Sequence, residues 1–319
     1  MNTRYLLSHD TDFAGELLRQ GELVVFPTET VYGLGASAVD PDAVRAIFSA
    51  KGRPADNPLI AHFGNTDEIY SLLPEHADDL GPLIATYMPG PLTLVVPAPR
   101  WASPILTAGL DSLAIRVPAH PVAQAVISAA AVPVAAPSAN RSGRPSPTTV
   151  EMAMSEMDGR VAAIVDGGSC PIGIESTVVD VRTPDEFSVL RPGHITAGEI
   201  AAATGRRERP KGAVERSPGT RYRHYRPNVP VVLVPSGLWG ACTSEAERVC
   251  RAPLFRRIPD ADAFTPKLYL TFWEAERDGN DCIVIEVPPE ATAPGLADRL
   301  NRAAETVYTP GAIEALFSG

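Results

Sequence analysis

The stretch that most constrains the fold is residues 23–35, because it begins as a buried strand and cannot continue as one. Four apolar residues, LVVF, precede Pro27, which lacks the N–H that an interior strand needs. The letters that follow, TETVYGLG, supply hydroxyls and glycines that let a ligand approach the backbone closely. We therefore expect a ligand-binding loop here. The alternative is that Thr28 and Thr30 only bind local backbone.

Length, charge and cysteine spacing set the broad class of protein. The chain has 319 residues, enough for two domains, since chains split above roughly 250–300 residues. Its net charge of −10 argues against gripping nucleic acid over the whole surface. Cys170, Cys242, Cys250 and Cys282 form no CxxC pair, which favours free thiols. The opening MNTRYLLSHD is not a secretory signal and no apolar run reaches about 20 residues, so we expect a cytoplasmic protein with no membrane partner.

Alternating apolar strands and helices predict an α/β fold in two parts. Short apolar strands of mixed spacing in residues 1–205 favour an open, twisted, mixed sheet with helices, as a first domain. Residues 206–228 are basic and rich in Gly and Pro, which is typical of a linker. Residues 229–319 predict a small Rossmann-like α/β domain, with a strand over 267–272 and no GxGxxG motif.

Two loops carry the residues best suited to bind phosphate. KGRPADNP, residues 51–58, places Lys51 and Arg53 on a Gly/Pro-held loop after a helix that begins at Asp40-Pro41. Arg offers a fork to phosphate and Lys a compact charge; the alternative is a solvated pair of surface charges. PSANRSGRPSPTT, residues 137–149, follows a buried strand and offers several hydrogen-bonding side chains to phosphate or ribose.

Several polar residues stand in otherwise apolar strands or in the basic linker. Arg116 lies in the strand SLAIRV and needs a partner, either a structural carboxylate or a nucleotide phosphate. His62 and His120 sit at a strand end and a helix start, and each alone is more typical of a structural group. Arg191 ends the strand SVLR. SPGTRYRHYRP, residues 217–227, is either a solvated tether or a segment whose aromatic rings stack on a base.

Five motifs along the chain occur in the order found in one family. PTETVYGLG, KGRPADNPL, PSANRSGRPSPT, GIESTVVD and LRPG resemble the YrdC-type threonylcarbamoyl-AMP synthases. The SPGTRYRHYRP linker and a C-terminal domain resemble the long, two-domain form of that enzyme. The resemblance covers most of residues 10–228. Arg226 departs from it, since the family usually has a small residue there.

The resemblance implies a nucleotidyltransferase that makes threonylcarbamoyl-AMP and pyrophosphate from L-threonine, bicarbonate or CO2, and ATP. A separate tRNA threonylcarbamoyl transferase complex then uses the product to form t6A in tRNA. Mg2+ is expected with ATP, without a dedicated protein site; Glu29 and Glu175 are candidates only through water. The linker is expected to contact the active site. Lys51 and Arg53 are the expected catalytic residues, neutralising phosphate charge. The remaining implied roles are threonine binding by Thr30, His62, His120 and Thr177, and ATP binding by Lys51, Arg53, Asn57, Arg116, Ser138, Asn140, Thr148, Arg191 and Tyr225.

Two other functions compete with this interpretation. The first is a double-stranded RNA or tRNA-binding module of the same fold, which the acidic composition opposes as a main function while leaving room for weak RNA binding through the linker. The second is a carbamoyl-transfer relative within hydrogenase-maturation proteins. That function expects zinc-finger and acylphosphatase-like segments, and the sequence shows neither.

Overall fold

A computed structural model describes residues 2–72, 77–209, 224–287 and 293–318. The chain divides into two compact units. Unit 1 comprises Met1–Ser142 and Ser146–Tyr222, and unit 2 comprises Gly143–Pro145 and Arg223–Gly319. Most of the predicted linker, residues 210–223, lies outside the described residues.

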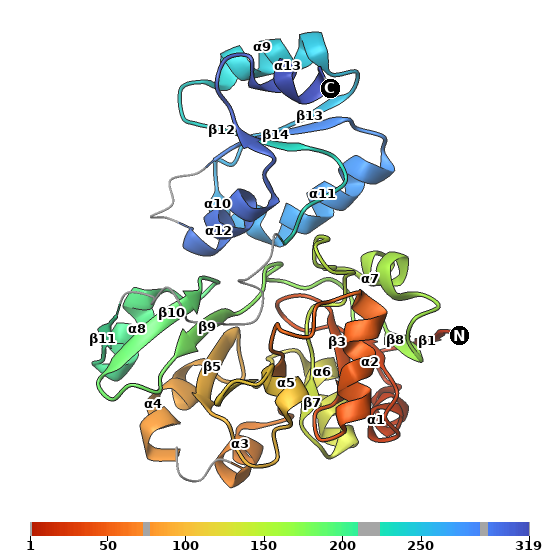
Figure 1. Ribbon diagram of the computed structural model, residues 1–319, viewed down its shortest axis with the longest axis vertical. Helices are drawn as coiled ribbons and strands as arrows, with labels where there is room; N and C mark the ends of the chain where they lie inside the picture. The colour runs from red at the N-terminus through yellow and green to blue at the C-terminus, as the bar shows by residue number, and fades with distance from the viewer. Residues whose placement is uncertain (1, 73–76, 210–223, 288–292, 319) are drawn as a thin grey trace. The chain divides into compact units, whose positions relative to one another are not determined.

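Unit 1 is built on one open sheet with helices against it (Figure 1). Among the described residues eleven strands pair in the order β1-β8-β2-β3-β7-β4-β6-β5-β9-β10-β11, with parallel pairs such as β4–β6 and antiparallel pairs such as β5–β6. Its elements are β1 (Arg4–Leu6), α1 (Thr11–Arg19), β2 (Val24–Phe26), β3 (Gly33–Ser37), α2 (Pro41–Lys51), β4 (Ile60–His62), α3 (Thr66–Leu72), α4 (Ala77–Tyr87), β5 (Leu92–Pro97), α5 (Pro104–Thr107), β6 (Ser112–Arg116), α6 (Pro121–Ala130), β7 (Val134–Ala135), α7 (Val150–Met157), β8 (Ala163–Val165), β9 (Thr177–Asp180), β10 (Glu186–Arg191), α8 (Ala197–Thr204) and β11 (Arg207–Glu208).

The stretch around Pro27 is the loop of a β2–β3 hairpin. β3 pairs antiparallel with β2, Phe26 opposite Gly33, so the two glycines predicted to belong to a loop lie in a strand. Gly35 is required by close approach, because a Cβ there would lie 2.5 Å from Cε1 of Phe26. The ligand loop is therefore confined to residues 27–32.

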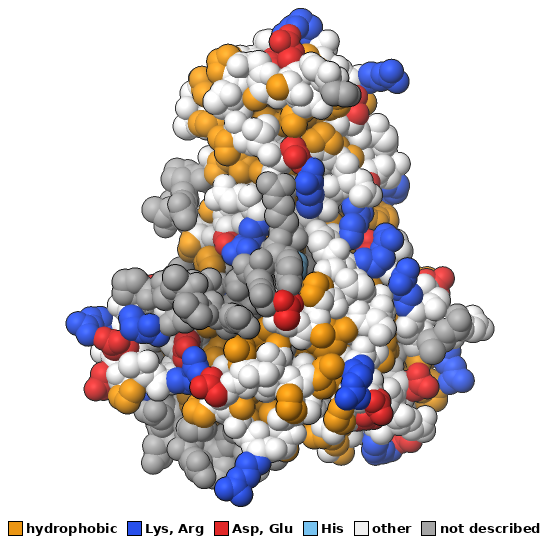
Figure 2. All heavy atoms as spheres, in the orientation of Figure 1, with side chains coloured by type: hydrophobic (Ala, Val, Ile, Leu, Met, Phe, Trp, Pro, Cys, Tyr) orange, Lys and Arg blue, Asp and Glu red, His pale blue; other side chains and the backbone are white. Residues whose placement is uncertain are grey.

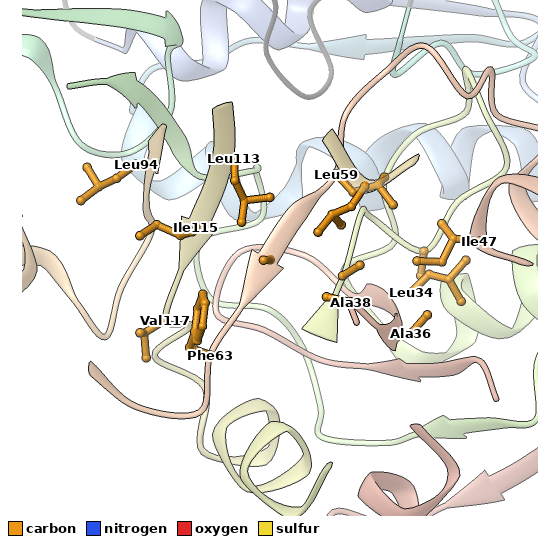
Figure 3. Close-up of a cluster of buried hydrophobic side chains, with 14 of the residues drawn as sticks. Leu34, Ala36, Ala38, Ile47, Leu59, Phe63, Leu94, Leu113, Ile115 and Val117 are labelled. Atoms are coloured by element: carbon orange, nitrogen blue, oxygen red, sulfur yellow. The ribbon is translucent and has the colours of Figure 1, made fainter. Parts of the chain in front are cut away.

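Apolar side chains on one face of the sheet form the main core of unit 1. Figure 3 shows Leu34 and Ala36 of β3 with Leu94 of β5 and Leu113 and Ile115 of β6 in this cluster. Ile47 of α2 packs against the same face. Because α2 is fixed by this packing, the residue at its C-terminal end, Lys51, has a defined position.

Unit 2 is a smaller parallel α/β layer structure. Its sheet order is β13-β14-β12-β15, and all three strand pairs are parallel. In Figure 1, α9 and α13 cover one face of this sheet and α10, α11 and α12 the other. Its elements are β12 (Val231–Val234), α9 (Trp239–Val249), β13 (Pro253–Arg256), α10 (Ala261–Phe264), η2 (Thr265–Lys267), α11 (Leu268–Arg277), β14 (Cys282–Glu286), α12 (Pro294–Ala303), β15 (Thr306–Val307) and α13 (Ala312–Phe317).

The predicted fold class is confirmed, with one error of secondary structure in unit 2. An open mixed sheet and a C-terminal α/β layer are both present. Residues 267–272 were predicted to be a strand, but residues 268–277 form helix α11. Leu268, Phe272 and Ala275 are buried at helical spacing, a pattern that the short aromatic run concealed.

The prediction of free cysteines has a structural counterpart. All four cysteines are free and buried. Among the described residues, no helix is both long and apolar enough to cross a membrane.

Candidate functional site

Lys51 is a buried cation held by the loop that follows β7. Helix α2 begins with Asp40 as N-cap and Pro41 in its first turn, and ends at Gly52 with φ 60°. Lys51 is only 3% exposed, and its Nζ donates to the main-chain carbonyls of Ser138 and Asn140. Burial, with a smaller effect of the Arg53 charge, lowers the pKa of Lys51 well below its ordinary value. An anion placed beside Lys51 would favour its charged form again.

The loop over residues 137–149 is tied to strand β3 and to Lys51. The N–H of Leu34 donates to Pro137 O at 2.8 Å, and that of Ala139 donates to Tyr32 O at 2.8 Å. Within the loop, Ser138 Oγ donates to Asn140 Oδ1 at 2.6 Å. Thr148 is buried further along the same loop. The structure thus brings the predicted ATP-binding residues Lys51, Ser138 and Asn140 together.

Arg53 and Asn57 lie on a loop that folds back on itself. Arg53 Nη2 donates to the carbonyls of Pro58 at 3.1 Å and Asn57 at 3.4 Å. Asn57 is buried and Arg53 is half-buried. Arg53 therefore holds the loop that carries it, two residues beyond Lys51.

Arg116 pairs with Glu29 and contacts Thr30, both from the hairpin loop. Its Nη2 lies 2.5 Å from Glu29 Oε1 and 3.0 Å from Thr30 Oγ1, and its Nε donates to Gly90 O at 3.1 Å. Glu29 Oε2 accepts from the N–H of Ala119 at 2.9 Å. Of the two partners considered for Arg116, the structure shows the structural carboxylate, Glu29. The resemblance implies ATP binding by Arg116 and threonine binding by Thr30, yet these two side chains are in contact.

Both predicted histidines have lowered pKa values. His62 of β4 lies opposite Arg116 of β6 in the sheet, and burial together with the Arg116 charge lowers its pKa to about 3. His120 caps α6, where its Nδ1 accepts from the N–H of Val122 at 3.2 Å. Burial lowers the pKa of His120 as well. The His62 ring is thus neutral at neutral pH, and the cap contact places the proton of a neutral His120 on Nε2.

Thr177 and Arg191 form a third buried group, at the start of β9 and the end of β10. Thr177 Oγ1 donates to Ile195 O at 2.7 Å. Arg191 Nη2 contacts the carbonyl oxygen of Ser176 at 3.0 Å and its hydroxyl at 3.1 Å. Ser176 also pairs with Thr93 of β5 at 2.8 Å. This group is joined to the Arg116 group through the turn at residues 90–91, since Thr177 N donates to Pro91 O.

Tyr225 belongs to unit 2, unlike the other predicted site residues. Its ring stacks on Tyr269 at a centroid distance of 5.6 Å, and the Arg299 guanidinium lies 5.2 Å from the ring centroid. Its φ of 70° is a left-handed conformation that is uncommon for a tyrosine. The neighbouring Arg226, the departure from the family pattern, ion-pairs with Glu305. Unit 2 therefore fixes Tyr225 firmly.

The two glutamates considered for magnesium have other partners. Both oxygens of Glu29 are bound by Arg116 and the Ala119 N–H, and Glu175 accepts from Ser146. Among the described residues no cluster of three or more acidic, His or Cys side chains could hold a metal ion. Each oxygen of Glu29 already accepts one hydrogen bond, and the Arg116 charge beside it disfavours a second cation at the same carboxylate.

The partners of these residues were not visible in the sequence. Glu29 is 87 residues from Arg116, and an arginine in an apolar strand signals that a partner exists without saying which. Thr28 does bind local backbone, as the simpler alternative held, donating to Val31 O at 2.6 Å. Ser176 appeared in the sequence only within the motif GIESTVVD, with no role predicted for it. The Thr-Glu-Thr spacing of the hairpin loop was the one local signal for this network.

The described surface offers little support for a broad nucleic-acid footprint. On the face shown in Figure 2, Lys and Arg side chains are interspersed with Asp and Glu. Many pair with an acid, for example Arg182 with Asp180 and Arg257 with Glu286. Four cations of the basic segment, Lys211, Arg216, Arg221 and Arg223, lie outside the described residues.

Comparison with known proteins gives the same assignment along most of the chain. Residues 16–193 match the family model described as "Telomere recombination" (Sua5, YciO, YrdC), and residues 195–305 match that of the threonylcarbamoyl-AMP synthase C-terminal domain. The threonylcarbamoyl-AMP synthase of Bacillus subtilis is 45% identical over 74% of this chain and 67% of its own length. That of Schizosaccharomyces pombe is 34% identical over 92% of this chain and 88% of its own.

A solved structure agrees over both units. The crystal structure of Pyrococcus abyssi Sua5 complexed with L-threonine has a TM-score of 0.85 and 34% identity, covering 96% of this chain and all of that one. The family models and the curated relatives cover the hairpin loop, both loops predicted to bind phosphate, and most of the C-terminal unit. The chain therefore belongs to the Sua5-type family of threonylcarbamoyl-AMP synthases.

Proposed function

We propose that this protein makes threonylcarbamoyl-AMP and pyrophosphate from L-threonine, bicarbonate or CO2, and ATP, for t6A formation in tRNA. The observation that carries the proposal is Lys51, a buried cation whose charged form is disfavoured and which lies against the loop of Ser138 and Asn140. A polyphosphate beside Lys51 would favour its charged form. The resemblance between this chain and its relatives supports the amino-acid substrate.

The charges of the site are divided in a way that suits these two substrates. Around Thr30, Arg116 is neutralised by Glu29 and His62 is uncharged, so a zwitterionic amino acid meets little net charge. Lys51 and Arg53 each donate to main-chain carbonyls, and together they bring two positive side chains to one loop. This second region is suited to triphosphate, which arrives as its magnesium complex and so brings its own metal.

The chemistry requires positioning more than a covalent nucleophile. The threonine amine forms a C–N bond to CO2 and loses a proton, giving a carbamate. A carbamate oxygen then bonds to the α-phosphorus while the bond from that phosphorus to the bridging oxygen breaks, and pyrophosphate leaves. Lys51 and Arg53 would stabilise the charge on the phosphates, and the threonine group would hold the amine in line.

Tyr225 and the other predicted ATP contacts remain part of this proposal. An aromatic ring can stack on adenine, and Arg191, Asn57 and Thr148 offer hydrogen bonds to the nucleotide. A cytoplasmic location, transfer of the product to a separate transferase complex and weak RNA binding are also predictions, supported by the family resemblance alone.

Pyrophosphate release from ATP, measured with threonine and bicarbonate omitted in turn, tests the proposal. Release should require both, and mass spectrometry should detect threonylcarbamoyl-AMP. Release that proceeds equally well without threonine would contradict the proposed substrate. As a control for replacing a threonine outside the site, Thr86→Val removes an exposed hydroxyl on α4. This variant should release pyrophosphate at the wild-type rate, with the same dependence on threonine and bicarbonate.

A further inference from the structure

The hydrogen atoms of the Thr28–Thr30 pair can be assigned from distances alone. Thr28 Oγ1 lies 2.6 Å from Val31 O and 2.8 Å from Thr30 Oγ1. Two oxygens this close need a proton between them. A carbonyl has none, so the Thr28 proton lies toward Val31 O, and the proton between the two hydroxyls must come from Thr30.

The Thr30 hydroxyl is thereby left as an acceptor. Its only proton points to Thr28, and one of its lone pairs accepts from Arg116 Nη2 at 3.0 Å. The N–H groups of Thr30 and Val31, both 3.2 Å from Thr28 Oγ1, share its other lone pair and fix its orientation. One lone pair of Thr30 remains, and no proton remains for it to donate.

Arg116 cannot turn away from this arrangement without breaking buried bonds. Glu29 holds its Nη2, the Gly90 carbonyl accepts from its Nε, and the guanidinium is almost fully buried. Glu29 is itself held by the Ala119 N–H. Thr30 is thus fixed from both sides, by Thr28 as its acceptor and by Arg116 as its donor.

We propose that Thr28 is a positioning residue that makes Thr30 a hydrogen-bond acceptor for an N–H or O–H donor of the amino-acid substrate. This inference rests on the proposed function, because it takes Thr30 to face threonine. The donor is either the α-amino group or the side-chain hydroxyl. The same polarity excludes the substrate carboxylate from Thr30, since two acceptors repel each other.

The test compares Thr28→Val with Thr28→Ser, measuring KM for threonine and for ATP together with direct calorimetric binding of threonine. Valine removes the acceptor for the Thr30 proton, so KM for threonine should rise about tenfold, as expected for one lost hydrogen bond, while KM for ATP changes less than twofold. Serine keeps the hydroxyl and should bind threonine as wild type does. If the valine variant fails to fold, Thr28→Cys, which keeps only a weak donor and acceptor, replaces it.

L-2-aminobutyrate, which lacks the hydroxyl, distinguishes the two donors. Equal weakening of both amino acids by Thr28→Val identifies the amino group, and weakening of threonine alone identifies the hydroxyl. An unchanged KM for threonine in the valine variant, an equal rise in KM for ATP, or the same defect in the serine variant would each overturn the proposal. Wild-type pyrophosphate release that does not depend on threonine would instead contradict the proposed function, so the two failures are separable.

Discussion

Each unit of the protein contains a buried ion held by main-chain groups, and the two ions differ in what the fold does to their charge. In unit 2, Glu245 of α9 accepts from Tyr308 Oη and from the N–H groups of Gly311, Ile313 and Glu314 at 2.9–3.1 Å. Burial alone would raise its pKa, but these hydrogen bonds outweigh burial and lower it. The fold therefore stabilises the charge of Glu245 at the start of α13.

Lys51 of unit 1 has the opposite balance. Burial dominates and lowers its pKa well below the ordinary value, so the fold disfavours its charge. A buried ion whose charge is already satisfied is structural, whereas one whose charge is disfavoured can gain from a ligand of opposite sign. The comparison assigns Glu245 to stability and Lys51 to ligand binding, and each assignment can be tested by substituting the residue.

The largest expected effect is on activity, from removing the two cations that we propose bind phosphate. Lys51→Met and Arg53→Ala should each lower threonine-dependent pyrophosphate release by about 100-fold or more, because the developing phosphate charge loses a partner. Steady-state rates at saturating substrates measure this. The exposed Lys267→Ala and Arg100→Ala are matched controls and should leave the rate unchanged. Near-wild-type rates in either site variant would remove Lys51 and Arg53 from the catalytic role.

The second effect is on stability, from removing the satisfied ion. Glu245→Ala leaves several N–H groups of α13 without an acceptor and should lower the free energy of unfolding by about 3 kcal/mol. Urea unfolding measures the loss, and Glu247→Ala, on the exposed side of the same helix, is the control. At a temperature where the variant is folded, its kcat and its KM for ATP should be those of wild type. A loss of kcat with an unchanged free energy of unfolding would contradict the assignment of Glu245 to stability.

A third effect concerns pH and the neutral His62. Its pKa falls from 6.5 in the unfolded chain to about 3 in the folded protein, so below pH 6.5 the unfolded state binds a proton that the folded state does not. Stability should therefore fall as pH falls from 6.5 toward 3, by about 2 kcal/mol between pH 6.5 and about pH 5. His62→Gln should flatten this slope in urea unfolding, whereas the exposed His9→Gln should not. Parallel slopes for all three proteins would show that His62 is not neutral in the fold.

The sequence predicted the positions of many strands and motifs, but it did not predict which strands pair with one another. Helix α2 could be placed closely because Asp40-Pro41 and Gly52 mark its ends locally. β3 was not predicted, because Gly35 is required by the Phe26 ring that packs against it from β2, and the sequence does not show this contact. Helix α11 was mistaken for a strand because a short aromatic run has no clear period.

For the site, residue types were accessible from the sequence and geometry was not. Arg116 needed a partner, but its pairing with Glu29 depends on the hairpin loop meeting β6. The direction of the hydrogen bond between Thr28 and Thr30 depends on a carbonyl three residues away, at Val31. Phosphate binding by Lys51 was predicted from its Gly/Pro-held loop and the role of Tyr225 from family resemblance, but no local pattern revealed that Lys51 would be buried.

The most direct test of the difference between the two buried ions is the number of protons taken up when ATP binds. Calorimetry of ATP binding at about pH 8.5, in buffers of different ionisation enthalpy, counts these protons; phosphate itself is fully ionised there, since its second pKa is about 6. Because Lys51 has a lowered pKa that a polyphosphate should raise again, wild type should take up a substantial fraction of a proton. Lys51→Met should take up none, and Glu245→Gln should match wild type. Equal proton uptake by wild type and Lys51→Met, with ATP bound to both, would contradict the account.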